Sequence, residues 1–426
     1  MQTDRYDNTI TTASAAVADA YADAVDCLLA GAPGLIPAFE AVTEADPAFA
    51  LGWVGLARAH QSFGAMPAAG QAMERARSLP AGLTERERSH LNAFDLLIAG
   101  KGPQAYAAIR AHVNTWPRDA LVAQTCSSVF GLIGFSGQPG REAEILAFTA
   151  ALMPHYGEDW WMTSQYAFAL CENGALARAE AQIDRALALR DRNAHGAHVR
   201  SHILYETGRT AEGRAWLSDW LAPYARDGIM YGHLTWHSAL WSLAERDTEA
   251  MWAQVDAAVA PDSGSLSPGI NVLTDTASIL QRAMMAGVAV SADRWAAVSA
   301  YALQAFPATG NAFIDVHAAL AHAMAGNDAA LEAIITAPAG PAADLVPGLA
   351  CGFRAMAAED WGAASENLTG AMSDLARIGG SRAQRDLVEQ CLLTSLIRDG
   401  REREAQDIAR LRRPLLVSGA DTHATH

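Results

Sequence analysis

Apolar residues recur along this chain with the period of an α-helix. Many stretches of about 10–15 residues carry apolar side chains at positions i, i+3, i+4 and i+7, and glycine or proline separates one stretch from the next. No segment shows the alternation of apolar and polar residues that marks a half-buried strand. The pattern therefore predicts an all-α protein.

The breaks between the predicted helices recur at a regular interval in the middle of the chain. Gly174 in "CENGALARAE" and Gly208 in "YETGRTAEGRAW" are 34 residues apart, and Gly64 marks a similar break. A helix–turn–helix unit of about 34 residues is typical of tetratricopeptide (TPR) repeats. We therefore expect a TPR-like α-solenoid of antiparallel helix pairs that forms a right-handed superhelix, with the first helix of each pair on the concave face.

The repeat pattern varies in clarity along the chain but suggests no second domain. The segment "APDSGSLSPGIN" falls in the clearest predicted loop. We expect residues 1–426 to form one array, with an N-terminal helical cap at 1–45, the best-defined repeats at 46–258, a loop at 259–272 and degenerate repeats at 273–426.

Composition and charge exclude several classes of protein. The 426 residues are half apolar, and 47 acidic against 31 basic residues give a net charge of −16. Such a charge repels phosphate backbones, so we expect no nucleic-acid partner. The sequence has no long uncharged apolar run, and its N-terminus lacks the basic segment followed by an apolar one that marks a secretory signal. We therefore predict a cytoplasmic protein without a membrane partner. The five scattered cysteines fit neither a disulfide framework nor a thiolate metal site.

Histidines concentrate in one part of the chain. Of 13 histidines, five lie between 195 and 237, in "AHGAHVRSHILYE" and "YGHLTWHSALW". His198 and His202 are four residues apart, as are His233 and His237, so each pair lies on one face of its helix. In a TPR array these two helices would be the first helices of consecutive repeats, about 10 Å apart. We therefore predict that both pairs face one concave pocket.

This constellation has a structural interpretation and three functional ones. In the structural one, the histidines pack between helices with their ring nitrogens hydrogen-bonded. In the first functional one, a divalent metal such as zinc or iron is bound. The candidate metal ligands are His198, His202 and His237, with Glu206, Asp315 or His317 as a further ligand.

The other two functional interpretations need no metal. Neutral imidazoles oriented by carboxylates would perform acid–base catalysis near physiological pH. The candidate catalytic residues are His198, His202, His233, His237 and Asp275. Alternatively, the pocket would only bind a small polar molecule, with Trp236 as a flat wall.

Further polar residues are candidates for binding the ligand. Asp275 or Asp315 would orient the histidines, and Arg282 or Arg385 would bind an anionic group. Asp315 also fits an N-terminal helix cap. The candidate substrate-binding residues are Tyr205, Glu206, Trp236, Arg282, Asp315, His317 and Arg385.

Two further positions, the helix start after Ser381 and Glu172, have competing interpretations. The helix start after Ser381 would hold an anion together with Arg385, or Ser381 would cap the helix while Arg385 pairs with Asp386 on the surface. Glu172 would line the groove or solvate a turn, and we favour the turn.

Several segments that are not generic repeat sequence resemble a known family, the one typified by tetratricopeptide repeat protein 38. They are "LTERERSHLNAFDLLIAGK", "LTDTASILQRAMMAG", "NAFIDVHAALAHAMAG" and "RIGGSRAQRDLVEQ". The resemblance spans nearly the whole chain and implies a helical-repeat fold of a bacterial-type member, without a defined reaction. Relatives carry a glutamate three residues after the second histidine, where this chain has Tyr205 followed by Glu206. The resemblance implies that one of these two replaces it.

Two functions remain open. TPR modules that bind peptides use basic and asparagine side chains, whereas this chain has one lysine, Lys101, and few asparagines. The histidine-rich lining favours a compact ligand, and hence an enzyme with hydrolase- or lyase-type chemistry, either acid–base or metal-assisted. The alternative is a non-catalytic scaffold for a protein partner or a homodimer, as in most TPR arrays.

Overall fold

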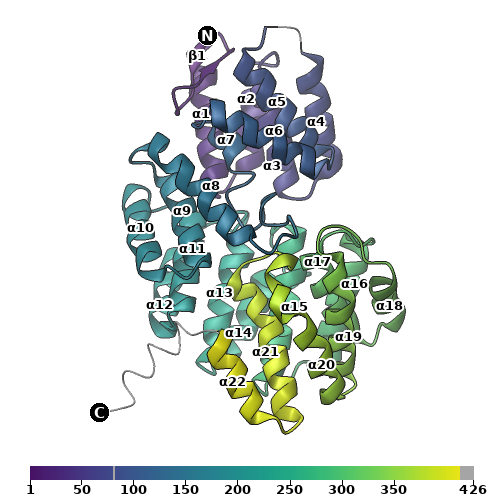
Figure 1. Cartoon of the computed structure of the whole chain (residues 1–426). Coiled ribbons are helices and arrows are strands. Elements are labelled where there is room, and N and C mark those ends of the chain that lie inside the picture. The colour runs from purple at the N-terminus through teal and green to yellow at the C-terminus, as the bar shows by residue number, and fades with distance from the viewer. Residues whose placement is uncertain (80–81, 413–426) are drawn as a thin grey trace.

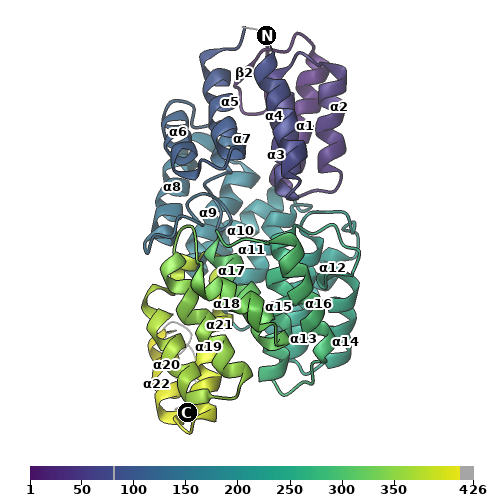
Figure 2. The same ribbon diagram turned by 90° about the vertical axis from the view of Figure 1, so that its right-hand side faces the viewer.

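The computed structural model describes residues 1–79 and 82–412 and confirms the all-α prediction. Twenty-two α-helices follow one another along the described chain. The only strands in these residues are β1 (Gln2–Thr3) and β2 (Thr9–Ile10), which form one short antiparallel pair. In Figures 1 and 2 the molecule is elongated, with the N-terminal helices at one end and the C-terminal helices at the other.

The N-terminal part contains seven helices and then a run of turns at 124–140. Capping residues fix several of the helix starts. Thr84 and Glu87 form a capping box in which each side chain accepts a hydrogen bond from the other residue's backbone N–H. The helices are α1 (Ala15–Ala30), α2 (Leu35–Ala45), α3 (Ala50–Ser62), α4 (Met66–Ser78), α5 (Glu85–Ile98), α6 (Gly102–Thr115) and α7 (Ala120–Ala123).

The middle of the chain has the clearest succession of helices. Gly174 and Gly208 end α9 and α11 with φ angles of 78° and 68°, a left-handed conformation that glycine adopts without strain. The predicted breaks at these glycines are therefore confirmed. The helices are α8 (Arg141–Tyr156), α9 (Trp160–Glu172), α10 (Leu176–Leu189), α11 (Ala194–Glu206), α12 (Thr210–Leu221), α13 (Tyr231–Ala244) and α14 (Thr248–Gln254), followed by the π-helical turn η1 (Val255–Val259).

The C-terminal part begins earlier than predicted. The loop expected at 259–272 is shorter, because Val259 ends η1 and α15 starts at Gly269, so that "GINV" forms the first turn of a helix. The end of the predicted C-terminal array, 413–426, lies outside the described residues. The elements are α15 (Gly269–Met285), α16 (Ala292–Ala305), α17 (Ala312–Ala325), α18 (Asp328–Thr336), η2 (Ala343–Leu345), α19 (Val346–Ala357), α20 (Trp361–Ala371), η3 (Met372–Ile378), α21 (Arg382–Arg398) and α22 (Glu402–Arg412).

Helices that are distant in sequence surround α11. Helix α1 packs on α11 from the N-terminal part, while α21 packs on both α11 and α15 from the C-terminal part. Buried apolar side chains form one large cluster from residues 6–169 and another from 273–405, with smaller clusters between them. The middle helices are thus covered from both ends of the chain.

One buried arginine joins the start of α8 to the C-terminal part. The Arg141 guanidinium donates hydrogen bonds to the backbone carbonyls of Gly134, Ala376 and Gly380. Burial lowers the pKa of Arg141 to about 9, so the side chain remains charged at neutral pH. Three carbonyls around one buried cation satisfy most of its donors and fix α21 against the middle helices.

Candidate functional site

The two histidine pairs lie on α11 and α13, as the spacing predicted. The start of α11 is fixed by Asn193, whose side-chain oxygen accepts a hydrogen bond from the Gly196 N–H while its amide donates to Ser164 on α9. The intervening helix, α12, separates α11 from α13 in sequence, but α11 and α13 pack directly against each other. The two pairs therefore face each other across a helix–helix contact.

Three ring nitrogens converge in this contact. The Nε2 atom of His198 lies 2.7 Å from Nε2 of His202 and 3.0 Å from Nε2 of His233. The His237 ring completes the group, with its centroid 4.7 Å from that of His202 and 5.0 Å from that of His233. One ring nitrogen from each of the four histidines lies within 4.8 Å of the others. We call these four residues the histidine cluster.

A carboxylate fixes the proton of one member. His233 Nδ1 lies 2.7 Å from Asp275 Oδ2, and both side chains are buried. An ionised carboxylate only accepts hydrogen bonds, so Nδ1 of His233 carries the proton and its Nε2 presents a lone pair to the cluster. His198 Nε2 then faces two neighbouring nitrogens, but it has only one proton or one lone pair to offer. Protein hydrogen bonds alone therefore cannot satisfy all three nitrogens.

Other nitrogens of the cluster are buried without a hydrogen-bond partner. They are Nδ1 of His202 and both ring nitrogens of His237. Buried polar atoms in folded proteins are almost always hydrogen-bonded, to the protein or to a bound group. Within the described protein these nitrogens have no partner, and an ordered water or a bound group would satisfy them.

Burial keeps three of these imidazoles neutral. It lowers the pKa of His202 to about 3, and it holds the pKa values of His198 and His237 well below the ordinary value, with the neighbouring rings adding to the effect. For Asp275, burial raises the pKa, while the contact with His233 opposes that shift. Neutral imidazole is the form that offers a lone pair to a proton or a metal ion.

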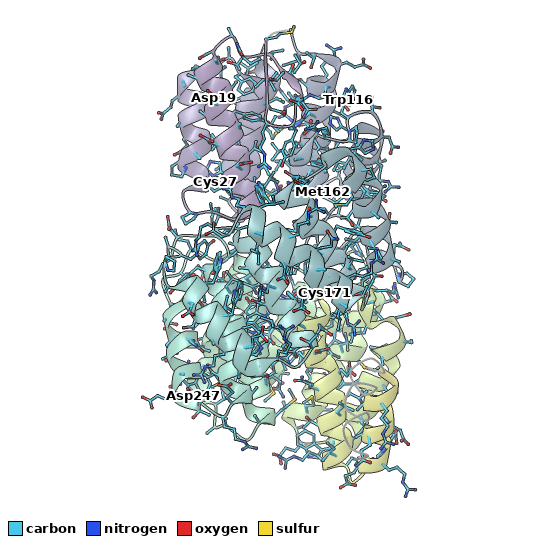
Figure 3. All side chains as sticks on the ribbon, turned by 90° about the vertical axis from the view of Figure 1, so that its left-hand side faces the viewer. Asp19, Cys27, Trp116, Met162, Cys171 and Asp247 are labelled. Carbon is cyan, nitrogen blue, oxygen red and sulfur yellow. The ribbon has the colours of Figure 1, made fainter. Side chains whose placement is uncertain are left out.

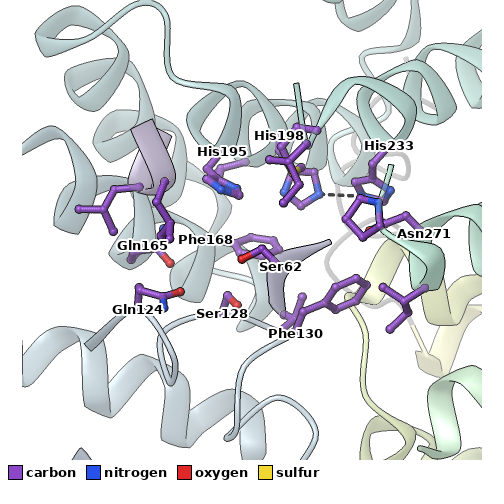
Figure 4. Close-up of a pocket in the computed structure, with 18 of the residues that line it drawn as sticks. Ser62, Gln124, Ser128, Phe130, Gln165, Phe168, His195, His198, His233 and Asn271 are labelled. Atoms are coloured by element: carbon purple, nitrogen blue, oxygen red, sulfur yellow. Dashed lines mark hydrogen bonds between the residues drawn. The ribbon is translucent and has the colours of Figure 1, made fainter. Parts of the chain in front are cut away.

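A cavity of about 300 Å³ lies beside the cluster. Figure 4 shows His198 and His233 on one side of this cavity, near Asn271, with Gln124 and Gln165 on the other. His202 and His237 are not among the described residues that line the cavity. The cluster thus has two members at the cavity wall and two behind them.

Trp236 does not form the flat wall that we expected. It is fully buried, and its ring stacks on His233 with a centroid distance of 5.1 Å and an interplanar angle of 14°. The stacking puts Trp236 behind the histidine and away from the described lining of the cavity. Its role is to hold the His233 ring in place.

Arg282 and Tyr205 are committed to other contacts. Arg282 donates hydrogen bonds to the Ala383 carbonyl, to Gln390 and to the Tyr205 hydroxyl, and Tyr205 in turn donates to Asp386. These bonds join α15 and α11 to α21. Neither side chain is among the described residues lining the 300 Å³ cavity, so the expected contact between Arg282 and an anionic ligand is not supported.

Asp315 and His317 also serve the protein's own structure. Asp315 accepts a hydrogen bond from the Gly310 N–H, while the cap residue of α17 is Asn311 rather than Asp315. His317 Nδ1 donates to the Phe313 carbonyl. Neither residue belongs to the histidine cluster, so the suggestion that they supply a further metal ligand is not supported.

The start of α21 is occupied by a carboxyl group of the protein itself. Ser381 caps the helix as predicted, and the Arg382 N–H donates to Glu172 Oε2 at 2.9 Å. Arg385 bonds to Glu142 and to the Gly380 carbonyl. The expected placement of Glu172 at a solvated turn is wrong, since Glu172 is buried and burial raises its pKa to about 7.

These acidic and basic residues form a separate site beside α21. The expected surface position of Asp386 is wrong, because Asp386 is buried. Glu206 is also buried, with Oε2 3.7 Å from Arg382 Nη2, so the carboxylate turns toward α21 and not toward the histidine cluster. A second cavity of about 240 Å³ lies here, lined by Glu142, Leu375, Ala376, Arg382, Arg385, Asp386 and Glu389.

A second group of histidines lies near the N-terminal end. His90 Nδ1 and His112 Nε2 lie 2.9 and 3.1 Å from Asp119 Oδ2, and Arg86 pairs with the same carboxylate. Burial would raise the pKa of Asp119, but these neighbours hold it well below the usual value. Because Arg86 already supplies the positive charge and Asp119 caps α7, we assign this group a structural role.

Sequence reasoning missed the polar residues at the far side of the 300 Å³ cavity. They come from α3, from the turns after α7 and from α9, which the pattern of helices does not bring together. The most prominent is Arg58, the only arginine among the lining residues described. The other polar residues on this side are Gln61, Ser62, Gln124, Ser128 and Gln165.

Comparison with models of known protein families found no match for this chain. Among the described residues, no helix combines the length and the apolar character that crossing a membrane requires. The five cysteines are all free, and Figure 3 shows Cys27 and Cys171 in separate parts of the molecule.

Proposed function

We propose that this protein is an enzyme that binds a small molecule in the 300 Å³ cavity and acts on it with a divalent metal ion held by the histidine cluster. The observation that carries this proposal is the convergence of the Nε2 atoms of His198, His202 and His233. With separations of 2.7 and 3.0 Å, His198 Nε2 faces two ring nitrogens but can form only one hydrogen bond, so the three nitrogens cannot all be satisfied by one another. A cation at that point would satisfy all three.

The arrangement of the cluster supports a metal. His198 and His202 on α11, and His233 and His237 on α13, are two i, i+4 pairs, a spacing that lets both histidines of a pair bind one ion. The hydrogen bond from His233 Nδ1 to Asp275 is the outer contact that metal-binding histidines usually make. Nitrogen ligands without thiolates fit zinc or iron(II).

The position of the cluster supports chemistry on a ligand. His198 and His233 line the cavity, so an ion held by them would lie beside a molecule bound there. A divalent ion there would polarise an oxygen of the ligand or lower the pKa of a bound water. The protein would contribute the histidine ligands and the Asp275 contact that orients His233.

The metal-free alternative keeps the same residues in a different role. Without an ion, the Asp275–His233 pair would act as an acid–base couple toward a molecule in the cavity. A scaffold function has less support, because α1 and α21 already cover α11, the helix whose face a partner would need.

We also propose a TPR-like arrangement of the helix pairs. The positions of Gly174 and Gly208 and the contact between α11 and α13 support a TPR-like array with right-handed superhelical stacking. The resemblance to the family of tetratricopeptide repeat protein 38 supports the same description. The composition supports a cytoplasmic location.

Metal analysis of the purified full-length protein tests the proposal. We expect about one zinc or iron per chain after expression without chelator, and uptake of one equivalent by chelator-treated protein. His202→Ala and His237→Ala should lose the metal, since both rings belong to the cluster but not to the described cavity lining. His195→Gln is the matched control, because His195 lies on α11 and lines the cavity outside the cluster.

The outcome separates the two chemistries. If the wild type neither retains nor takes up zinc or iron, the metal proposal is wrong and the acid–base alternative replaces it. If His202→Ala and His237→Ala keep the metal while folding normally by circular dichroism, the ion is bound elsewhere, and the proposed site is wrong.

A further inference from the structure

Arg58 occupies the end of the 300 Å³ cavity that lies away from the histidine cluster. Its Nη1 and Nη2 donate to the side-chain oxygens of Gln61 and Gln124, both at 3.0 Å. Figure 4 shows Gln124 across the cavity from His198 and His233, and the bond to Gln124 therefore puts the guanidinium at that end. The cavity has a cationic end and an imidazole end.

No carboxylate compensates this cation within residues 1–79 and 82–412. The pKa of Arg58 is lowered to about 10 by burial alone, and its Nε is buried without a partner. Even so, the side chain is protonated at neutral pH. The described lining of the cavity contains no aspartate or glutamate, although the chain has 47 of them. Arg58 is half-buried at the cavity wall, and a partly desolvated charge without an opposite charge is unfavourable unless something pairs with it.

Three fully buried arginines show the contacts that a structural arginine makes in this protein. Arg141 donates to three backbone carbonyls, and Arg385 pairs with Glu142 and a backbone carbonyl. Arg282 contacts a backbone carbonyl, two side chains on neighbouring helices and Ser278 on its own helix. Arg58 is held only by two neutral amide oxygens, and its charge faces a cavity.

The walls between the two ends are mostly apolar. They are formed by Leu28, Leu29, Leu35, Phe130, Phe135 and Phe168. A volume of about 300 Å³ is at the lower end of cavities that bind small organic ligands. A ligand that fits this cavity must combine an apolar body with one group that pairs with the single guanidinium of Arg58.

We propose that the ligand is a small organic carboxylate, whose carboxylate group pairs with Arg58 while its other end faces His198 and His233. A guanidinium forms two parallel hydrogen bonds to a carboxylate. One arginine among neutral amides matches a single negative charge better than the two charges of a phosphate. The inference rests on the proposed function only in taking the same cavity as the ligand site.

Binding of paired probes to the full-length protein tests this assignment. The probes are acetate, butyrate, benzoate and phenylacetate, each compared with its primary amide, which has nearly the same shape but no charge. Thermal unfolding and isothermal titration calorimetry measure binding. We expect at least one carboxylate to bind saturably and to raise the Tm, while its amide binds roughly ten- to hundredfold more weakly.

Variants of Arg58 test whether its guanidinium is the group that binds the carboxylate. Arg58→Met should weaken carboxylate binding by roughly ten- to hundredfold and leave the Tm of the unliganded chain unchanged or higher, since an uncompensated charge is removed. Arg58→Lys should bind with intermediate affinity, because lysine keeps the charge but lacks the planar fork. Arg178→Met on the exposed face of α10 is the control and should bind like the wild type.

Three results would overturn the assignment. The first is the absence of any preference for carboxylate over amide across the four pairs. The second is equal carboxylate affinity in Arg58→Met and the wild type. The third is a large loss of unliganded stability in both Arg58 variants, which would identify Arg58 as a structural residue.

Metal content measured on the same samples keeps the two proposals apart. Arg58→Met should retain as much metal as the wild type. If no protein sample contains metal but carboxylate binding still depends on Arg58, the metal proposal fails and the carboxylate assignment stands. If metal is bound at the cluster but carboxylate affinity is the same with and without the Arg58 side chain, only the carboxylate assignment fails.

Discussion

The contact between Asp275 and His233 gives the sharpest test of the histidine cluster. Substitution of Asp275 by Asn keeps the size of the side chain but removes its charge. The asparagine amide can donate a hydrogen bond to His233 Nδ1, which would move the imidazole proton to Nε2. A protonated Nε2 cannot bind a metal ion, so the cluster would lose one ligand.

The size of the effect follows from the geometry. The hydrogen bond is 2.7 Å long, and both side chains are no more than 4% exposed, so solvent screens it little. Loss of such an outer contact typically weakens metal affinity by about 10- to 100-fold, which corresponds to about 1.4–2.8 kcal/mol. We expect Asp275→Asn to weaken zinc binding by this amount.

Competition for zinc with a chromophoric chelator measures the change. The control is Asp315→Asn, which alters another buried carboxylate; Asp315 lies on α17, accepts a hydrogen bond from the Gly310 N–H and lies outside the cluster. The control should bind zinc within about threefold of the wild type, a margin well below the effect expected for Asp275. Equal zinc affinity in both variants, with both folded, would refute the assigned proton positions and the role of Asp275.

Three further predictions concern stability. Arg141→Met should lower the free energy of unfolding by about 3–5 kcal/mol in urea titrations, because three buried carbonyls lose their donor, whereas Arg178→Met should change it little. The pKa of Glu172 is about 7 in the folded chain against an ordinary 4.5, so the folded state holds this proton more tightly and the wild type loses stability as pH rises through 7. Glu172→Gln should remove that dependence on pH. The free energy of unfolding of the variant, relative to that of the wild type, should therefore rise by up to about 3 kcal/mol between pH 5 and 8. A difference between the two proteins that is constant with pH would contradict the raised pKa of Glu172. Gly55→Ala should destabilise the protein by about 1–3 kcal/mol, since the added Cβ would lie 2.1 Å from a buried phenylalanine ring. Gly70→Ala, with no atom within 4 Å of its Cβ, should stabilise the protein by about 0.5–1 kcal/mol, and equal effects in thermal melts would contradict this packing.

Local features of the sequence predicted the helices and the histidine cluster. Gly174 and Gly208 end helices because glycine adopts the left-handed conformation that reverses the chain, a requirement that acts within a few residues. The pairs at 198/202 and 233/237 share helix faces for a similar reason, since the period of the helix fixes which side chains align. Both inferences needed only short-range information and one assumption about neighbouring helices.

Long-range packing decided the features that the sequence did not predict. Arg282 and Arg385 have the charge expected of anion-binding residues. Because α21 packs against the middle helices, however, Arg282 donates to the Ala383 carbonyl and Arg385 pairs with Glu142. Arg58 has no unusual sequence context, and its importance depends on which residues surround it. Glu172 was misplaced because nothing near it in sequence indicates that the start of α21 covers it.

The packing of α1 and α21 against the middle helices has a consequence for how this protein folds. In an open repeat array each unit contacts only its neighbours, so stability is nearly a sum over adjacent units. Here Leu28 from α1 and Gln384 from α21 both line the 300 Å³ cavity, so the pocket exists only after both ends of the chain have docked. Any molecule that occupies the pocket therefore favours the docked state of the ends, and ligand binding and completion of the fold are thermodynamically linked.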